Sequence, residues 1–206
     1  MPQRSYRWLF LSLAIVGLAT DQISKYGVFR WLYPGPTSYR GEREVVEGWF
    51  KLTAEFDPTV PQCECAFNGL QSWSAPLMPR VNHGALFGLG GEHKGGANQV
   101  FAVVSVLAAT GIIVWATRRA TMSDGWLCAA LGLILGGTIG NLYDRIVFNG
   151  VRDFLYFYKI EWPVFNVADC CLVVGAGMLL VHAFFFTPSE EKPPSQEPEG
   201  SELLAD

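Results

Sequence analysis

The sequence predicts an all-α membrane protein with four transmembrane helices and a small extracytoplasmic region of β-sheet and loops on the outer face. Half of the 206 residues are hydrophobic, and the mean hydropathy is positive. The apolar residues fall into long blocks, and a block of about 18 residues is long enough to cross a bilayer. The length of the chain favours one domain over two.

The net charge of −4 comes from the C-terminal tail. After Thr187 the chain has six of its 19 acidic residues and one of its 15 basic residues, so the body carries 13 acidic and 14 basic side chains. A nearly neutral body lacks the basic surface of a nucleic-acid-binding protein. Residues 187–206 are rich in Pro, Glu and Ser and are expected to form a disordered acidic cytoplasmic tail, whereas residues 1–186 form the membrane domain.

The first apolar block, Trp8–Thr20, follows two arginines, as in a secretory signal peptide. No cleavage site of small residues follows it, and the apolar pattern resumes after Lys25, so a retained helix over about Trp8–Tyr33 is predicted. Asp21 and Lys25 are four residues apart and share a helix face, where they can pair. Spacing alone favours a pair that anchors the helix end over one that supports a functional site.

Three further helices are predicted from later apolar blocks. Val100–Thr117 and Trp126–Tyr143 each have 18 residues without a charge, and Val164–Phe186 has 23 residues that include Asp169. Each block meets the length needed to span a bilayer. The third helix is rich in small residues, which let membrane helices pack closely; these are Gly132, Gly136, Gly137 and Gly140.

The segment 34–97 is long, mostly polar and rich in Gly and Pro. Apolar and polar residues alternate over Phe50–Phe56, which is the pattern of a half-buried strand. Pro58–Arg80 has four prolines and no clear periodicity, so an irregular excursion is expected there. Val81–Gly88 is compact and punctuated by glycine, which allows close backbone approach. A small sheet on the membrane surface is the predicted structure of this outer-face loop.

The cysteines are possible metal ligands or catalytic nucleophiles. Cys63 and Cys65 lie near His83 and His93, but their spacing matches no common zinc site, so no metal is predicted. Cysteine catalysis needs a positioned histidine. Cys128, Cys170 and Cys171 lie in apolar blocks without one and are interpreted as small hydrophobic residues.

The basic residues predict the orientation. Arg4 and Arg7 precede the first helix, and Arg118 and Arg119 lie in the short connection between the second and third helices. The positive-inside bias places both groups in the cytoplasm. Both termini are then cytoplasmic, and the segments 34–97 and 144–163 face outside.

This topology brings the polar residues of the apolar blocks to the outer end of the bundle. Ionisable groups at the mouths of membrane helices are costly to place and are therefore candidates for function. The candidates are Asp21, Lys25, Asn82, Asn141, Asp144, Arg145, Asp153, Asn166 and Asp169. Asn166 can be explained as a helix cap, but Asp169 is followed directly by a hydrophobic run and is harder to explain by structure alone.

Asp153 and Asp169 are interpreted as a paired-carboxylate hydrolytic site. Peptide hydrolysis by two carboxylates needs one ionised group to activate water and one protonated group to donate to the carbonyl oxygen. Two like charges held close together do not both ionise easily, so such a pair titrates as a unit with one pKa raised. Neutral asparagines such as Asn141 and Asn166 can orient these groups without changing the proton count.

Five motifs resemble those of the lipoprotein signal peptidases, also called type II signal peptidases. The chain has D-Q-I-S-K at 21–25, N-H-G-A-L-F-G at 82–88, G-G-T-I-G-N-L-Y-D-R at 136–145, G-V-R-D-F at 150–154 and F-N-V-A-D at 165–169. The motifs occur in order, and together they cover nearly the whole chain apart from the tail. Leu86 replaces a residue that is commonly small, Val151 is one place early, and Pro58–Arg80 is similar to an insertion.

The resemblance implies an aspartic endopeptidase of the bacterial inner membrane, without a cofactor and monomeric, which acts among membrane lipids. Such an enzyme removes the signal peptide from a prolipoprotein by cutting just before a cysteine that carries diacylglycerol. Carried over by motif, Asp153 and Asp169 are the catalytic pair. The residues expected to bind substrate or support the pair are Asn82, Asn141, Arg145, Asn166, Asp21 and Lys25, with Asp144 and Gly84 structural.

Two other classes of protein remain as alternatives. A small transporter or proton-relay protein would also place carboxylates in helices, but it would distribute polar groups along their length rather than at one end. A non-catalytic lipid-binding or scaffold protein would explain the aromatic residues at the membrane boundary but not two unpaired acids.

Overall fold

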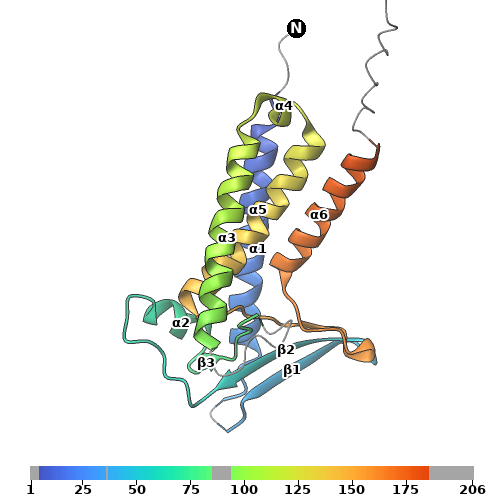
Figure 1. Cartoon of the computed structure of the whole chain (residues 1–206). Helices are drawn as coiled ribbons and strands as arrows, with labels where there is room; N and C mark the ends of the chain where they lie inside the picture. The colour runs from blue at the N-terminus through green and yellow to red at the C-terminus, as the bar shows by residue number, and fades with distance from the viewer. Residues whose placement is uncertain (1–4, 36, 85–93, 186–206) are drawn as a thin grey trace, which may run out of the picture.

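The computed structural model describes residues 5–35, 37–84 and 94–185. Long helices run beside one another, a small sheet lies across one end, and the short helix α4 (Arg119–Met122) lies at the other end (Figure 1). The long helices are α1 (Arg7–Trp31), α3 (Lys94–Ala116), α5 (Gly125–Val147) and α6 (Val167–Phe185). The predicted tail, residues 187–206, lies outside the described residues.

A long helix lies near each of the four predicted places, with shifted ends. The second helix begins at Lys94, six residues before the predicted Val100, and the third continues through Arg145 to Val147. Among the described residues, α3, α5 and α6 are long and apolar enough to cross a membrane. The 25-residue α1 is long enough as well, but polar residues such as Asp21 and Lys25 lower its mean hydropathy.

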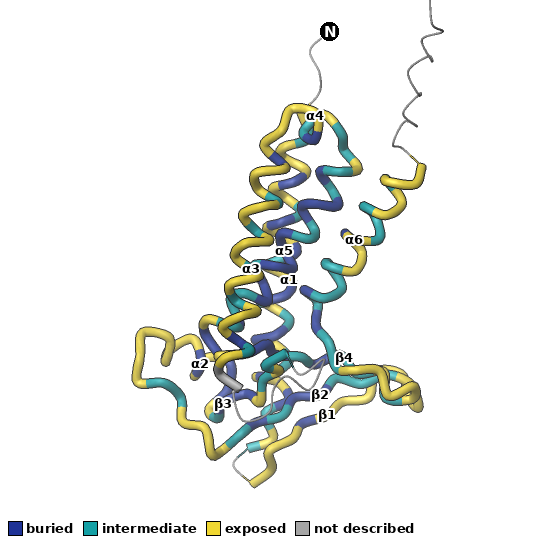
Figure 2. The backbone as a smooth tube through the Cα atoms, in the orientation of Figure 1, coloured by how far each residue is buried: buried dark blue, intermediate teal, exposed yellow. Residues whose placement is uncertain are grey.

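The helix α5 is the centre of the bundle. It packs beside α1, α3 and α6, and about half of its most apolar stretch is buried, whereas only a small share of the apolar stretches of α3 and α6 is buried (Figure 2). The exposed side chains of α3 and α6 are largely apolar, for example Leu107 at 66% and Val173 at 71% exposure. Continuous exposed apolar surface of this kind is suited to contact with lipid.

A single face of α1 is buried against α5. Its members are Phe10, Ala14, Gly17, Asp21 and Lys25, which are spaced by three or four residues as one helix face requires. Phe10 and Ala14 pack into an apolar core with Cys128, Leu131 and Leu135 of α5, and Gly17 lies against Gly136 of the same helix. The face therefore changes from apolar to charged as it approaches the sheet.

The sheet has β2 (Phe50–Asp57) at its centre. The strand pairs antiparallel with β1 (Arg40–Val46), and on its other edge with two short strands, β3 (Met78–Pro79) and β4 (Leu155–Tyr156). The predicted strand over 50–56 is thus confirmed. Ala54 and Phe56 are buried as expected, in a core with Phe29 and Phe154, so the sheet is packed onto the end of α1.

The segment Pro58–Arg80 is more ordered than the predicted irregular excursion. It contains α2 (Asn68–Ser74) and β3, which sequence periodicity missed because a seven-residue helix spans only two turns. Gln71 of α2 connects the segment to the end of α5, because its Nε2 donates to the carbonyl of Val147 at 2.6 Å. Its Oε1 accepts from the amide of Cys63 at 2.9 Å within the same segment. Cys63 and Cys65 form a disulfide with each other.

The contact between α1 and α5 depends on Gly136. A Cβ at this position would lie 2.7 Å from the carbonyl oxygen of Ala14 and 3.2 Å from the amide of Leu18, both backbone atoms that side-chain rotation does not move. We expect Gly136→Ala to destabilise the protein by about 1–3 kcal/mol because it overpacks this contact. Gly111→Ala on α3 is the matched control, since a Cβ there meets nothing within 4 Å. Unfolding in detergent micelles tests this, and equal stability of the two variants would contradict the close approach.

Candidate active site

Asp153 and Asp169 line one cavity of about 440 Å³ at the sheet end of the bundle. Asp169 lies in the first turn of α6, and Asp153 lies just before β4. The chain between them doubles back, because Leu155 and Phe165 pair as an antiparallel bridge with N···O distances of 2.8 and 3.0 Å. This hairpin brings two acids that are 16 positions apart to the same cavity.

Asn166 joins the two acids. Its Nδ2 donates to Oδ1 of Asp153 at 2.7 Å, and its Oδ1 accepts from the amide of Asp169 at 3.1 Å. Its own amide donates to Oδ2 of Asp169 at 3.2 Å. The side chain is fully buried. Asn166 therefore caps α6 and also contacts both carboxylates, so its role as a helix cap does not exclude a role in orienting the two acids.

Asn141 orients Asp169 from α5. Its Oδ1 accepts from Nζ of Lys25 at 3.1 Å and from Nδ2 of Asn166 at 3.2 Å, and its Nδ2 donates to Oδ1 of Asp169 at 2.9 Å. An ammonium group can only donate, so Lys25 fixes which side of the amide faces it. The NH₂ group of Asn141 is consequently directed at Asp169.

Asn82 contacts Asp153 from the opposite side. Its Nδ2 donates to Oδ2 of Asp153 at 3.0 Å, and its Oδ1 accepts from the amide of Gly84 at 2.8 Å. Gly84 has φ of +95°, a left-handed conformation, and a Cβ there would collide with the ring of Phe101. The glycine thus allows the tight turn that holds the Asn82 amide. Leu86, Phe87 and Gly88 of the same motif lie outside the described residues.

Arg145 brings a positive charge to the cavity wall. Its Nη1 donates to the carbonyl of Asn141 at 3.2 Å, and its guanidinium lies 5.5 Å from the centre of the Phe101 ring. It forms no ion pair within 4.0 Å with any described residue, unlike the neighbouring cations Lys25 and Arg152. An unpaired guanidinium beside two acids can compensate negative charge that develops on a bound molecule.

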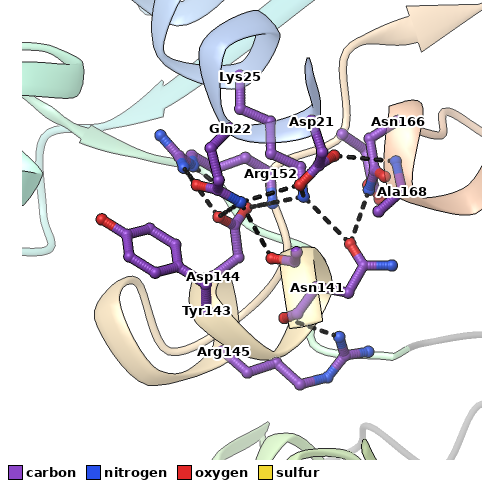
Figure 3. Close-up of polar contacts among 12 residues, drawn as sticks. Asp21, Gln22, Lys25, Asn141, Tyr143, Asp144, Arg145, Arg152, Asn166 and Ala168 are labelled. Carbon is purple, nitrogen blue, oxygen red and sulfur yellow. Dashed lines mark hydrogen bonds and ion pairs between the residues drawn. The ribbon is translucent and has the colours of Figure 1, made fainter. Parts of the chain in front are cut away.

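Beneath the cavity lies a cluster of four fully buried charges: Asp21, Lys25, Asp144 and Arg152 (Figure 3). Lys25 pairs with Asp21 at 2.9 Å and with Asp144 at 3.4 Å. Arg152 binds Asp144 through Nη2 at 2.8 Å and Nε at 3.2 Å. Two acids and two bases cancel, which is how buried charges are tolerated.

Asp21 also ties α1 to the beginning of α6. Its Oδ1 accepts from the amide of Ala168 at 2.9 Å, one residue before Asp169. A carboxylate at this position satisfies a free amide of the helix N-terminus and suits its positive end. The Asp21–Lys25 pair is therefore more than an anchor for α1, because it fixes the helix that carries Asp169.

Two residues of this network were missed from the sequence, Arg152 and Gln22. The guanidinium of Arg152 lies 3.9 Å from the Phe148 ring centre and donates to Oγ of Ser74 at 3.2 Å and to Oε1 of Gln22 at 3.0 Å. Gln22 in turn donates to Asp21 at 2.9 Å. Both lie inside the motifs, next to the predicted site residues Asp153 and Asp21. Their position within these motifs is the feature of the sequence that points to them.

Burial raises the pKa of Asp153 to about 6, and the negative charge of Asp169 adds to this effect. The hydrogen bonds from Asn82 and Asn166 oppose it by stabilising the carboxylate. Near neutral pH this acid is thus able to hold a proton that an ordinary aspartate has already lost.

Of the possible zinc ligands Cys63, Cys65, His83 and His93, the last lies outside the described residues. Cys63 and Cys65 are bonded to each other, which leaves neither as a thiolate ligand. Over the ranges that the structure describes, no group of three or more His, Cys, Asp and Glu side chains is placed to hold a metal ion.

Two acids that share a cavity at one end of a set of membrane-type helices define a membrane-embedded hydrolase of the aspartic type. The model of the signal peptidase (SPase) II family matches residues 13–185. The chain belongs to this family, and its activity is that of a lipoprotein signal peptidase.

Individual relatives agree with the family model. The lipoprotein signal peptidase of Rhodopirellula baltica is 39% identical over 209 residues, which cover 95% of this chain and 78% of that protein. The one from Pseudomonas syringae pv. tomato is 33% identical over 180 residues, covering 86% and 85%. A solved structure of a bacterial membrane enzyme has a TM-score of 0.65 and covers 91% of this chain and 99% of its own, at 17% identity, which shows a shared fold.

The cluster beneath the cavity predicts a specific requirement for a guanidinium at position 152. The substitution Arg152→Lys keeps the positive charge. It removes the planar guanidinium group, which donates to Asp144, Ser74 and Gln22 at the same time. We expect a loss of about 2–4 kcal/mol in unfolding free energy in detergent. Arg40→Lys, at a half-exposed position, is the control and should change stability by less than about 0.5 kcal/mol. Equal effects of the two substitutions would contradict the role of Arg152.

Proposed function

We propose that Asp153 and Asp169 are the catalytic pair that removes the signal peptide of a prolipoprotein, cutting just before the diacylglyceryl-modified cysteine. The observation that carries this proposal is their convergence on one cavity, with Asn166 bonded to both carboxylates. The raised pKa of Asp153 supports a division of roles between them. Asp153 is the protonated acid and Asp169 is the ionised base.

In the first step Asp169 takes a proton from a water molecule while the water oxygen bonds to the carbonyl carbon that precedes the cysteine. Asp153 gives its proton to the carbonyl oxygen, so a neutral tetrahedral intermediate forms. In the second step the C–N bond breaks as the cysteine nitrogen receives the proton from Asp169. One hydroxyl of the intermediate returns its proton to Asp153, and the pair regains its starting state.

The asparagines and Arg145 position the reactants. Asn82 and Asn166 hold Asp153, and Asn141 holds Asp169, through amide groups that carry no charge. These amides can also bind the extended backbone of the substrate at the scissile bond. Phe101 and the apolar residues from Trp162 to Phe165 also line the cavity, and this apolar lining suits the acyl chains of the lipidated cysteine.

For the membrane arrangement we propose four spans, with α1 as the fourth, and the sheet on the outer face of the bacterial inner membrane. Arg7, Arg118 and Arg119 lie together at the end opposite the sheet, where the amide of Tyr6 donates to the carbonyl of Met122 (Figure 1). The positive-inside bias makes that end cytoplasmic. Both ends of the chain, including the tail 187–206, are then cytoplasmic, and residues 1–186 act as one monomeric domain among membrane lipids.

The catalytic pair is tested by Asp153→Asn and Asp169→Asn. Each variant should lose at least about 10³-fold in kcat for release of the signal peptide, because neither a base nor an acid of the pair can be replaced by an amide. The assay uses purified protein and a synthetic lipidated precursor, with Asp57→Asn as the control, because Asp57 is a half-buried acid at the end of β2 that does not line the cavity. Full turnover by either active-site variant would refute the assignment.

The pH dependence of the free enzyme follows from the raised pKa of Asp153. The acid keeps its proton below pH about 6 and loses it above, so kcat/KM should fall as pH rises through that region. Asn82→Ala removes a hydrogen bond that lowers this pKa, and the descending limb should therefore move to higher pH. A limb that moves to lower pH or stays in place would contradict the protonated role of Asp153.

A further inference from the structure

A groove lies on the lipid-facing side of α1, apart from the catalytic cavity. Its volume is about 540 Å³, and it shares no lining residue with the cavity that contains the two acids. Its walls come from α1, from Tyr143 of α5 and from Trp73 of α2, and its α1 residues are Leu18, Gln22, Ile23, Tyr26, Gly27 and Arg30. Trp73 belongs to the Pro58–Arg80 insertion and packs on Tyr26 with ring centres 4.7 Å apart.

Three polar side chains of the groove, Gln22, Tyr26 and Tyr143, form hydrogen bonds within the protein. Gln22 bonds inward to Asp21 and Arg152, and the hydroxyls of Tyr26 and Tyr143 bond to each other at 2.8 Å. The rest of the wall is apolar except for Arg30 at one end. Such a surface is suited to a hydrocarbon chain rather than to a polar molecule.

The length of the groove fits one leaflet of a bilayer. From Leu18 to Arg30 the helix rises about 18 Å, at 1.5 Å per residue. Half of a hydrocarbon core is about 15 Å. An acyl chain that begins at Arg30 would therefore reach the level of Leu18 near the middle of the membrane.

Arg30 gives the groove its charge. It is exposed in the last turn of α1, next to the exposed Trp31, and no hydrogen bond or ion pair connects it to another described residue. Arg and Trp at this position are typical of the headgroup level of a membrane. We propose that the groove binds one anionic phospholipid of the leaflet on the sheet side, with its phosphate on Arg30 and an acyl chain along Leu18–Gly27.

The glycine in the groove makes the proposal testable without damage to the fold. A Cβ at Gly27 meets nothing within 4 Å, so a side chain can leave the helix there, and Gly27→Leu places a bulky one in the groove. Gly111→Leu on α3 is the matched control, because Gly111 is also an exposed mid-helix glycine with nothing within 4 Å. Arg30→Gln removes the charge alone.

The experiment is native mass spectrometry of the full chain released from nanodiscs that contain equal amounts of phosphatidylglycerol and phosphatidylcholine. The wild type and Gly111→Leu should retain one phosphatidylglycerol, and Gly27→Leu should retain about tenfold less of it. Arg30→Gln should lower the preference for phosphatidylglycerol about fivefold.

Two results would overturn the proposal. One is equal phosphatidylglycerol retention by Gly27→Leu and Gly111→Leu. The other is unchanged retention together with a higher KM of Gly27→Leu for the lipidated precursor, which would assign the groove to the substrate instead. The retention measurement itself does not depend on whether Asp153 and Asp169 are the catalytic pair, since it needs no turnover.

Discussion

The pairing of four buried charges is the constraint on which the rest of the structure depends. Asp21, Lys25, Asp144 and Arg152 are all inaccessible to solvent, and each would be strongly unfavourable without its partners. These residues come from α1, from α5 and from the chain just before Asp153. The three segments must therefore be arranged so that every buried charge has a partner of opposite sign. The site above them inherits its geometry from this requirement.

Between the charged cluster and the cavity lies a layer of asparagines. Lys25 fixes the orientation of the Asn141 amide, and Asn141 and Asn166 in turn fix the two acids, through hydrogen bonds of 2.7–3.2 Å. Because amides are neutral, they transmit direction without bringing the charge of the cluster closer to the acids. The site can thus be rigid while the proton balance of Asp153 is controlled mainly by its burial and by Asp169.

The sequence predicted most of the fold through the apolar blocks, and most of the site through polar residues inside those blocks. The strand over 50–56 was visible in its alternation, but α2 was not, because its order comes from single contacts such as that of Gln71 with Val147. Arg152 was overlooked because a charged residue in a polar connection looks solvated until tertiary packing buries it. The hairpin at Leu155 and Phe165 was equally hidden, since it pairs residues across an irregular stretch.

That hairpin has a consequence for how the protein can vary. Its backbone pairing closes the chain just after Asp153 and just before Asn166, and the turn beyond it, around Tyr158–Ile160, is largely exposed at the edge of the sheet. The paired backbone lies between this turn and the two acids. Insertions or deletions in the turn therefore need not move the acids, as is usual for loops outside a paired stem. The tip is consequently a natural place for lineage-specific additions, or for a spectroscopic label that reports on the sheet end of the bundle without displacing the acids.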